Sequence, residues 1–177
     1  MLFRSLLLQD SFPSWLFSVK HGATTVWERW DGWTPEKGFQ NPGMNSFNHY
    51  SLGSCGEWMF DTVAGIDVDP AAPGFRHTII RPRPGPGLTS AQATYDSIRG
   101  NIATHWSVDG KAFLLDVTVP LNTTATVILP TADAGSVKEG GAPVAGNADI
   151  PRAVDSTEPA AFTIGSGKYH FTCTLAP

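Results

Sequence analysis

The 177-residue sequence predicts an α+β multidomain chain, in which a helical segment (residues 1–69) precedes an antiparallel β-sandwich (residues 70–177). Two observations predict this division. Apolar and aromatic residues recur at helical spacing before Asp69-Pro70, whereas apolar and polar residues alternate with a period of two after it. Turn signals also become frequent and regular after Pro70, as is typical of an antiparallel sandwich.

The composition is compatible with a packed core and argues against two classes of protein. The hydrophobic fraction is 41%, and no stretch approaches the roughly 18 apolar residues needed to span a bilayer. The net charge of −4 argues against a nucleic-acid-binding protein, for which a basic surface is typical. Six Trp and ten Phe are many for this length, and they serve either a core or a sugar-binding cleft.

The helical segment is expected to contain three helices. Residues 3–7 place their apolar side chains on one face, and a second helix over residues 13–19 begins with proline in its first turn. The longest candidate, residues 46–66, is apolar on two sides, which is typical of a helix packed between neighbours. Because three such helices cannot cover one another, we expect partner helices upstream or from another chain.

The N-terminus and the cysteines give information on the cellular compartment of the protein. The apolar run Leu6–Leu8 is too short for a signal-peptide core and is interpreted as a buried helix end. Cys55 and Cys173 fall in unrelated elements, so we expect free thiols, no metal site and no cofactor. Free thiols fit a reducing compartment, and we predict a cytoplasmic location.

The segment after Pro70 is expected to contain seven short strands. Val108-Asp-Gly-Lys111 and Ile164-Gly-Ser-Gly-Lys168 are hairpin turn signals. Residues 135–155, rich in Gly, Ala and Pro, are predicted to form a loop. The expected strands are His77–Arg81, Ala91–Ser97, Ile102–Trp106, Phe113–Val119, Ala125–Leu129, Ala161–Ile164 and Lys168–Leu175.

Residue types that carry chemistry are densest around Glu28, which lies between Trp27 and Trp30. A carboxylate near a Trp-lined cleft has a raised pKa where the site is dry, and a lower pKa where Arg29 approaches it. The sequence leaves both effects open. Taken alone, the run Trp27–Trp30 is also typical of a packed turn with a surface ion pair.

The order and spacing of several motifs resemble glycoside hydrolase family 78, the bacterial α-L-rhamnosidases. The resemblance covers nearly the whole chain and fails only in the Gly/Ala/Pro-rich loop after Gly135. The motifs that carry it are Pro13-Ser-Trp15, Gly22-Ala-Thr-Thr-Val-Trp-Glu-Arg-Trp-Asp31, Met44-Asn-Ser-Phe-Asn-His-Tyr50, Gly56-Glu-Trp58, Val63-Ala-Gly-Ile66 and Pro73-Gly-Phe75.

The resemblance implies the last helices of an (α/α)6 catalytic barrel followed by a C-terminal β-sandwich. It implies an inverting hydrolase of terminal α-L-rhamnosides, in which Glu28 is the general base and His49 contacts rhamnose. The partner would be a rhamnose-containing glycoside or oligosaccharide. An inverting glycosidase also needs a general acid, about 6.5–9.5 Å from the base. No segment before Glu28 resembles that acid, so the chain alone is expected to be inactive.

Structural interpretations of the same residues stay open. A helical histidine such as His49 is usually a core residue, and Trp27 and Trp30 fit a barrel core as well as the substrate-binding wall. Glu57 and Asp31 are interpreted as structural residues. The alternative for the chain as a whole is a carbohydrate-binding or structural sandwich module without catalysis, or a non-catalytic homologue that pairs with another subunit.

Overall fold

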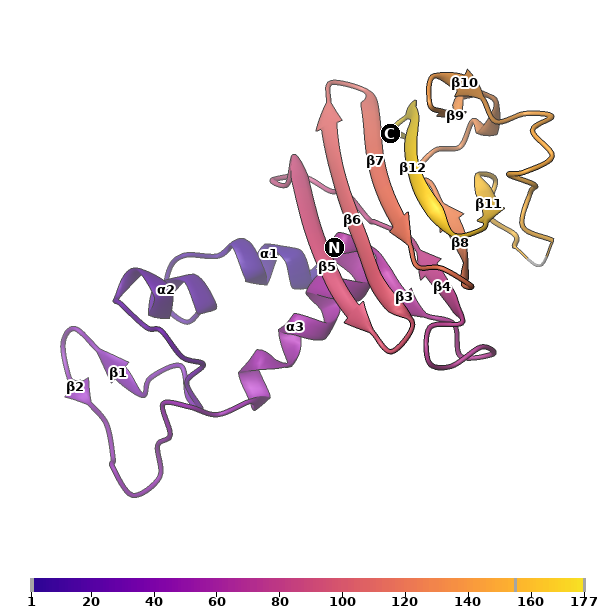
Figure 1. Cartoon of the computed structure of the whole chain (residues 1–177). Helices are drawn as coiled ribbons and strands as arrows, with labels where there is room; N and C mark the ends of the chain where they lie inside the picture. The colour runs from indigo at the N-terminus through magenta and orange to yellow at the C-terminus, as the bar shows by residue number, and fades with distance from the viewer. Residues whose placement is uncertain (1, 155, 177) are drawn as a thin grey trace. The chain divides into compact units, whose positions relative to one another are not determined.

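The computed structural model describes residues 2–154 and 156–176, with side chains from Ser5 onward. By their internal contacts these residues form two compact units, one ending at Glu57 and one beginning at Trp58. The first is helical and irregular, and the second is built of β-sheets (Figure 1). The predicted fold class, a helical segment followed by antiparallel sheets, is confirmed.

The first unit contains two short helices and a small hairpin. Ser14 begins the second helix, because its side-chain oxygen accepts a hydrogen bond from the Phe17 amide at 3.0 Å. The elements are α1 (Leu2–Leu8), α2 (Trp15–Lys20), β1 (Trp33–Thr34) and β2 (Gly38–Phe39), and β1 pairs antiparallel with β2.

Both predicted helices form, but Ser14 caps α2, so Pro13 precedes that helix instead of lying in its first turn, and the end of α1 is not buried. Leu6 is 44% exposed and Leu8 is 41% exposed within this chain. The buried helix end predicted for this run is therefore wrong for the chain by itself, and the Phe3 side chain lies outside the described ones.

The helix predicted over residues 46–66 is wrong at both ends. Residues 46–50 are irregular, and Ile66 begins a strand, β3 (Ile66–Val68). Between them the backbone changes its helical form twice, through η1 (Ser51–Ser54, 3-10 helix), α3 (Cys55–Trp58) and η2 (Met59–Ala64, π-helix).

Glycine explains where this helical run ends. Gly65 has φ of +78°, the left-handed conformation that commonly follows the last turn of a helix. A Cβ atom at Gly65 would lie 2.2 Å from the backbone nitrogen of Pro82, so the chain also passes too close for any side chain. The Arg81 amide donates to the Gly65 carbonyl at 2.8 Å, which fixes this close approach.

The second unit is a sandwich of a six-stranded sheet, in the order β10-β9-β12-β7-β6-β5, and a four-stranded sheet, in the order β11-β8-β4-β3 (Figure 1). Neighbouring strands are antiparallel except β4 and β8, which are parallel. The remaining elements are β4 (His77–Ile80), β5 (Ser90–Ser97), β6 (Gly100–Asp109), β7 (Ala112–Val119), β8 (Thr124–Ile128), η3 (Ala134–Ser136), β9 (Lys138–Glu139), β10 (Ala142–Pro143), β11 (Ala161–Ile164) and β12 (Gly167–Thr174).

One of the two predicted hairpins is confirmed and the other is wrong. Strands β6 and β7 pair through Asp109 and Ala112, and Gly110 between them has φ of +58°. Strands β11 and β12 belong to different sheets, so Gly165 and Ser166 carry the chain across the sandwich instead. A short Gly/Ser run permits a crossing between sheets as readily as a tight hairpin, and the sequence does not distinguish them.

The core lies between the two sheets. Trp106 and Phe113 of the six-stranded sheet are fully buried, as is Ile80 of the four-stranded sheet. The indole nitrogen of Trp106 donates to the Val63 carbonyl at 2.7 Å, and so fixes the end of η2 against the sheet.

The Gly/Ala/Pro-rich segment 135–155 is mostly irregular up to residue 154, as predicted, while Asp155 lies outside the described residues. It also contains the β9–β10 hairpin, and it contributes Val137, Val144 and Ile150 to the core. The predicted domain boundary after Asp69 stays a prediction.

Candidate functional site

Glu28 and His49 lie on two irregular segments of the first unit that pair through their backbones. The Glu28 amide donates to the Ser46 carbonyl at 2.9 Å, and the His49 amide donates to the Val26 carbonyl at 2.9 Å. Residues 26–28 and 46–49 therefore run side by side. This pairing brings together the two motifs that contain the predicted catalytic and substrate-binding residues.

The carboxylate of Glu28 is half-buried and anchored through one oxygen. The Ser46 amide donates to Oε2 at 2.8 Å, in addition to the backbone bond between the same two residues. Within the described part of the chain, Oε1 has no hydrogen-bond partner. The hydrogen bond to Oε2 thus fixes the orientation of the carboxylate.

His49 is half-buried and lies just before η1, not in the helix that the sequence predicts. Its ring stacks on exposed Tyr50, with centroids 5.7 Å apart and an interplanar angle of 10°. Its Nδ1 accepts from the Ser51 amide at 3.3 Å. A neutral imidazole that accepts at Nδ1 carries its proton on Nε2, where it can donate to a ligand hydroxyl.

Trp27 and Trp30 are half-buried, and each packs against another aromatic side chain. The Trp27 ring meets the Phe47 ring edge-on at a centroid distance of 5.3 Å, and Trp30 meets Trp15 edge-on at 5.0 Å. Both indoles therefore have a packing role within this unit. Their contact with a substrate stays a prediction.

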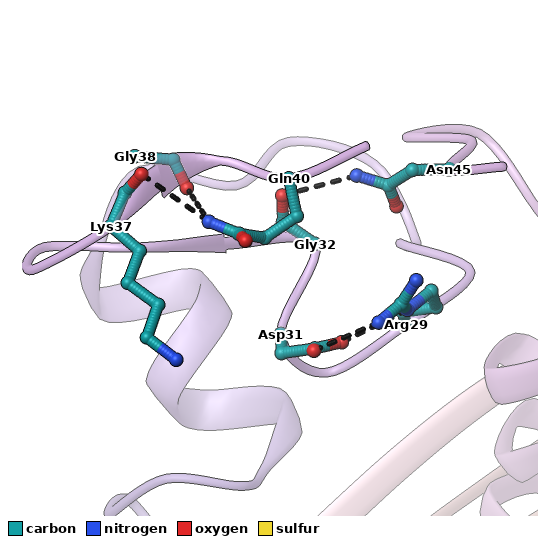
Figure 2. A network of polar contacts seen from close by, with 7 residues as sticks. All are labelled: Arg29, Asp31, Gly32, Lys37, Gly38, Gln40 and Asn45. Carbon is teal, nitrogen blue, oxygen red and sulfur yellow. Dashed lines mark hydrogen bonds and ion pairs between the residues drawn. The ribbon is translucent and has the colours of Figure 1, made fainter. Parts of the chain in front are cut away.

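Arg29 is engaged by Asp31. Its Nε and Nη2 donate to the two carboxylate oxygens at 3.0 Å and 2.9 Å, as Figure 2 shows. These hydrogen bonds from the guanidinium hold the pKa of the Asp31 carboxyl below its ordinary value. The arrangement supports the interpretation of Asp31 as a structural residue that closes a turn.

A second network, not singled out by sequence reasoning, holds the loop between the two motifs (Figure 2). The Gly32 carbonyl accepts from the Gln40 amide at 2.9 Å and from Asn45 Nδ2 at 3.0 Å. Gln40 in turn donates to the carbonyls of Lys37 and Gly38 at 3.3 Å and 3.0 Å. A Cβ atom at Gly32 would lie 2.8 Å from Asn45 Oδ1, so glycine lets the loop close.

The other candidate residues have no such connection to this site. Glu57 is exposed in α3. Cys55 and Cys173 are free thiols, and burial raises the pKa of Cys55 and raises that of Cys173 to about 11. Within residues 2–154 and 156–176, no group of three or more His, Cys, Asp or Glu could hold a metal ion, and no helix is long and apolar enough to cross a membrane.

Two family models match consecutive parts of the chain. Residues 2–63 match the six-hairpin glycosidase domain of bacterial alpha-L-rhamnosidases. Residues 65–142 match the bacterial alpha-L-rhamnosidase C-terminal domain. The two models meet near the end of η2, close to the point where the first compact unit gives way to the sandwich.

Individual relatives agree with the family models. An alpha-L-rhamnosidase of Streptomyces avermitilis is 45% identical over 94% of this chain, and one of Formosa agariphila is 41% identical over 77%. A crystal structure of S. avermitilis alpha-L-rhamnosidase complexed with L-rhamnose matches 96% of this chain and 16% of that one, with a TM-score of 0.81 and 43% identity. The chain spans 15% of the length of each of the two curated relatives.

Proposed function

Because this chain belongs to the bacterial α-L-rhamnosidase family, we propose that it supplies part of an inverting hydrolase of terminal α-L-rhamnosides. It corresponds to the end of the six-hairpin glycosidase domain and the C-terminal domain. Its chemical contribution is the general base, Glu28. The general acid belongs to the rest of such an enzyme, so this chain by itself does not hydrolyse rhamnosides.

The observation that carries the proposal is the double attachment of Glu28 to Ser46. A general base must present a carboxylate oxygen to water in a fixed direction. The hydrogen bond from the Ser46 amide to Oε2, 2.8 Å long, supplies that orientation and leaves Oε1 to receive the proton. In the inverting reaction, Glu28 deprotonates the water that attacks the anomeric carbon, while a second carboxyl protonates the departing glycosidic oxygen.

His49 is proposed to hold the sugar. The backbone pairing with Val26 places it on the segment next to Glu28, and its Nε2 can donate to a sugar hydroxyl. Trp27 and Trp30 are proposed to add apolar contact area, which suits rhamnose because carbon 6 of this sugar is a methyl group. The bacterial cytoplasmic location predicted from the free thiols remains part of the same proposal, and cell fractionation tests it.

A chimera tests the role of Glu28, with this chain replacing the matching segment of the S. avermitilis enzyme. With p-nitrophenyl α-L-rhamnoside as substrate, we expect Glu28→Gln to lower kcat by about 10²–10⁴-fold, because general-base catalysis contributes that much. Glu36→Gln is the matched control, since Glu36 is an exposed glutamate of the same unit. Turnover that is insensitive to Glu28→Gln would remove the base assignment.

The 177-residue chain alone tests the second half of the proposal. We expect no turnover of the same substrate above the buffer rate, because the chain lacks a general acid. Robust turnover that Glu28→Gln abolishes would refute the inactivity and preserve the base assignment.

A further inference from the structure

A row of polar side chains crosses the outer face of the six-stranded sheet. Gln92 of β5, His105 of β6, Asp116 of β7 and His170 of β12 are direct cross-strand neighbours. The residues that precede and follow them along β6 and β7 are more buried and include core positions. Because side chains alternate between the two faces of a strand, the row faces away from the core.

This row borders a hollow of about 370 Å³. The residues that line it include Gln92, Thr94, His105, Asp116 and Thr118, together with the small residue Ala103. The hollow therefore presents an amide, two hydroxyls, an imidazole and a carboxylate within one shallow site. Such a set both donates and accepts hydrogen bonds.

The carboxylate of Asp116 is held between two imidazoles. His170 Nδ1 lies 2.6 Å from Oδ1, and His105 Nδ1 lies 3.5 Å from Oδ2. All three side chains are about half exposed, so a ligand can reach them. The two contacts fix the direction of the carboxylate before any ligand arrives, which lowers the conformational cost of binding.

We propose that this hollow is a second binding site, and that its ligand is a neutral sugar unit of a glycan. Vicinal sugar hydroxyls both donate and accept, which matches the mixed lining of amide, hydroxyl, imidazole and carboxylate groups. The carboxylate of Asp116 disfavours an anionic ligand. Among the described residues no group of three His, Cys, Asp or Glu side chains is arranged to hold a metal ion, so a polyhydroxylated ligand is the best chemical match.

The proposed site is independent of Glu28. It lies on the sandwich unit, and none of its residues belongs to the motifs of the first unit. It gives a location to the sandwich-based carbohydrate binding that the sequence leaves open as an alternative function. A chain could therefore bind sugar here whether or not the catalytic proposal holds.

An NMR titration of the ¹⁵N-labelled 177-residue chain tests the proposal, with L-rhamnose, D-galactose and D-glucose as separate probes. We expect at least one sugar to give saturable amide shifts in β5, β6 and β7, with a Kd on the order of 1 mM for so shallow a site. Asp116→Asn should raise that Kd by about tenfold or more, because it removes a charged hydrogen-bond acceptor. Thr172→Ala, on the outer face of the neighbouring strand β12, is the control and should leave the Kd unchanged.

Residue-specific shifts distinguish this site from the one at Glu28. Shifts confined to residues 27–50 would support the first site and overturn this one. Saturable shifts in β5–β7 with inorganic phosphate and none of the sugars would also overturn it, as would the absence of saturable shifts there. Gln92→Ala provides a second variant, so that loss of binding does not depend on the folding of Asp116→Asn.

Discussion

All the buried apolar side chains among the described residues belong to the unit that begins at Trp58, whereas the unit that ends at Glu57 buries only the side chains of Ser14 and Ser18. In the sandwich, the side chains of two sheets meet in one core. In the first unit, main-chain hydrogen bonds and half-buried aromatic contacts hold the segments together. The described side chains of the unit that carries Glu28 thus form no buried apolar core.

Exposed side chains repeat this contrast. In the first unit Phe39 is 75% exposed, Tyr50 is 83% exposed and Met44 is 68% exposed. Apolar surface of this kind is costly in water and is typical of faces that other elements cover. The comparison predicts that the sandwich is stable by itself, whereas the segment that carries Glu28 needs other elements to cover its apolar surface. The following experiments test this difference.

The largest effect is expected in the sandwich core. Trp106→Ala should lower the free energy of unfolding of this unit by about 3–5 kcal/mol, because it empties a fully buried site. It also leaves the Val63 carbonyl without its indole donor. Urea unfolding followed by circular dichroism measures the change. Ile98→Ala, at a side chain that is 86% exposed, should change it by less than about 0.5 kcal/mol.

A single added methyl group should also be costly at Gly65, which lies between η2 and β3 and closely approaches Pro82. Gly65→Ala forces alanine into the left-handed conformation and places its Cβ 2.2 Å from Pro82 N, so we expect a loss of at least about 2 kcal/mol. Gly110→Ala is the matched control, because Gly110 has φ of +58° with open space around it. Equal losses for the two variants would show that the close approach to Pro82 adds nothing.

In the first unit, the destabilising effect of a substitution should stay within that unit. Trp15→Phe removes the hydrogen bond from the indole to the Leu52 carbonyl, 2.9 Å long, and retains an aromatic ring. We expect hydrogen exchange around residues 15–57 to accelerate about fivefold, which corresponds to about 1 kcal/mol. Amides of β6 and β7 should keep their protection. Faster exchange in both units would show that they unfold as one, contrary to the comparison.

The sandwich was more predictable than the site, because its signals are periodic. The alternation in residues 113–119 follows from burial on one face, and β7 covers that segment with buried side chains at every second position. The helix predicted over residues 46–66 is wrong at its C-terminal end because apolar spacing says nothing about Gly65 and its contact with Pro82. It is wrong at its N-terminal end because residues 46–49 pair through their backbone with residues 26–28. The hairpin predicted at Gly165 is wrong because no local sequence signal shows that the chain passes from one sheet to the other.

The site depends on contacts that no periodicity encodes. Glu28 and His49 were identified from motif resemblance, but their attachment through Ser46 and Val26 joins irregular segments. The row from Gln92 to His170 is set by strand register, so none of its members stands out in the sequence. The sequence thus predicts which residues belong to the site, whereas only the structure shows which residues they contact.

The smallest expected effect concerns Asp116 and pH. Its pKa lies below the ordinary value of 3.8, chiefly because His170 donates a hydrogen bond to the carboxylate, with a smaller effect of His105. Since the folded pKa is the lower one, the contact stabilises the folded state above about pH 4, and this contribution is lost as pH falls through the folded pKa. For a half-exposed pair it should stay below about 1 kcal/mol.

Urea midpoints of the sandwich between about pH 2 and 6 measure this contribution. Asp116→Asn should unfold at lower urea than the unchanged chain near the upper limit, and the difference should shrink toward the lower limit as the carboxylate protonates. Asp109→Asn, at the exposed end of β6, is the control and should track the unchanged chain. A difference for Asp116→Asn that is constant across this range would mean that the imidazole contacts do not depend on the charge of Asp116.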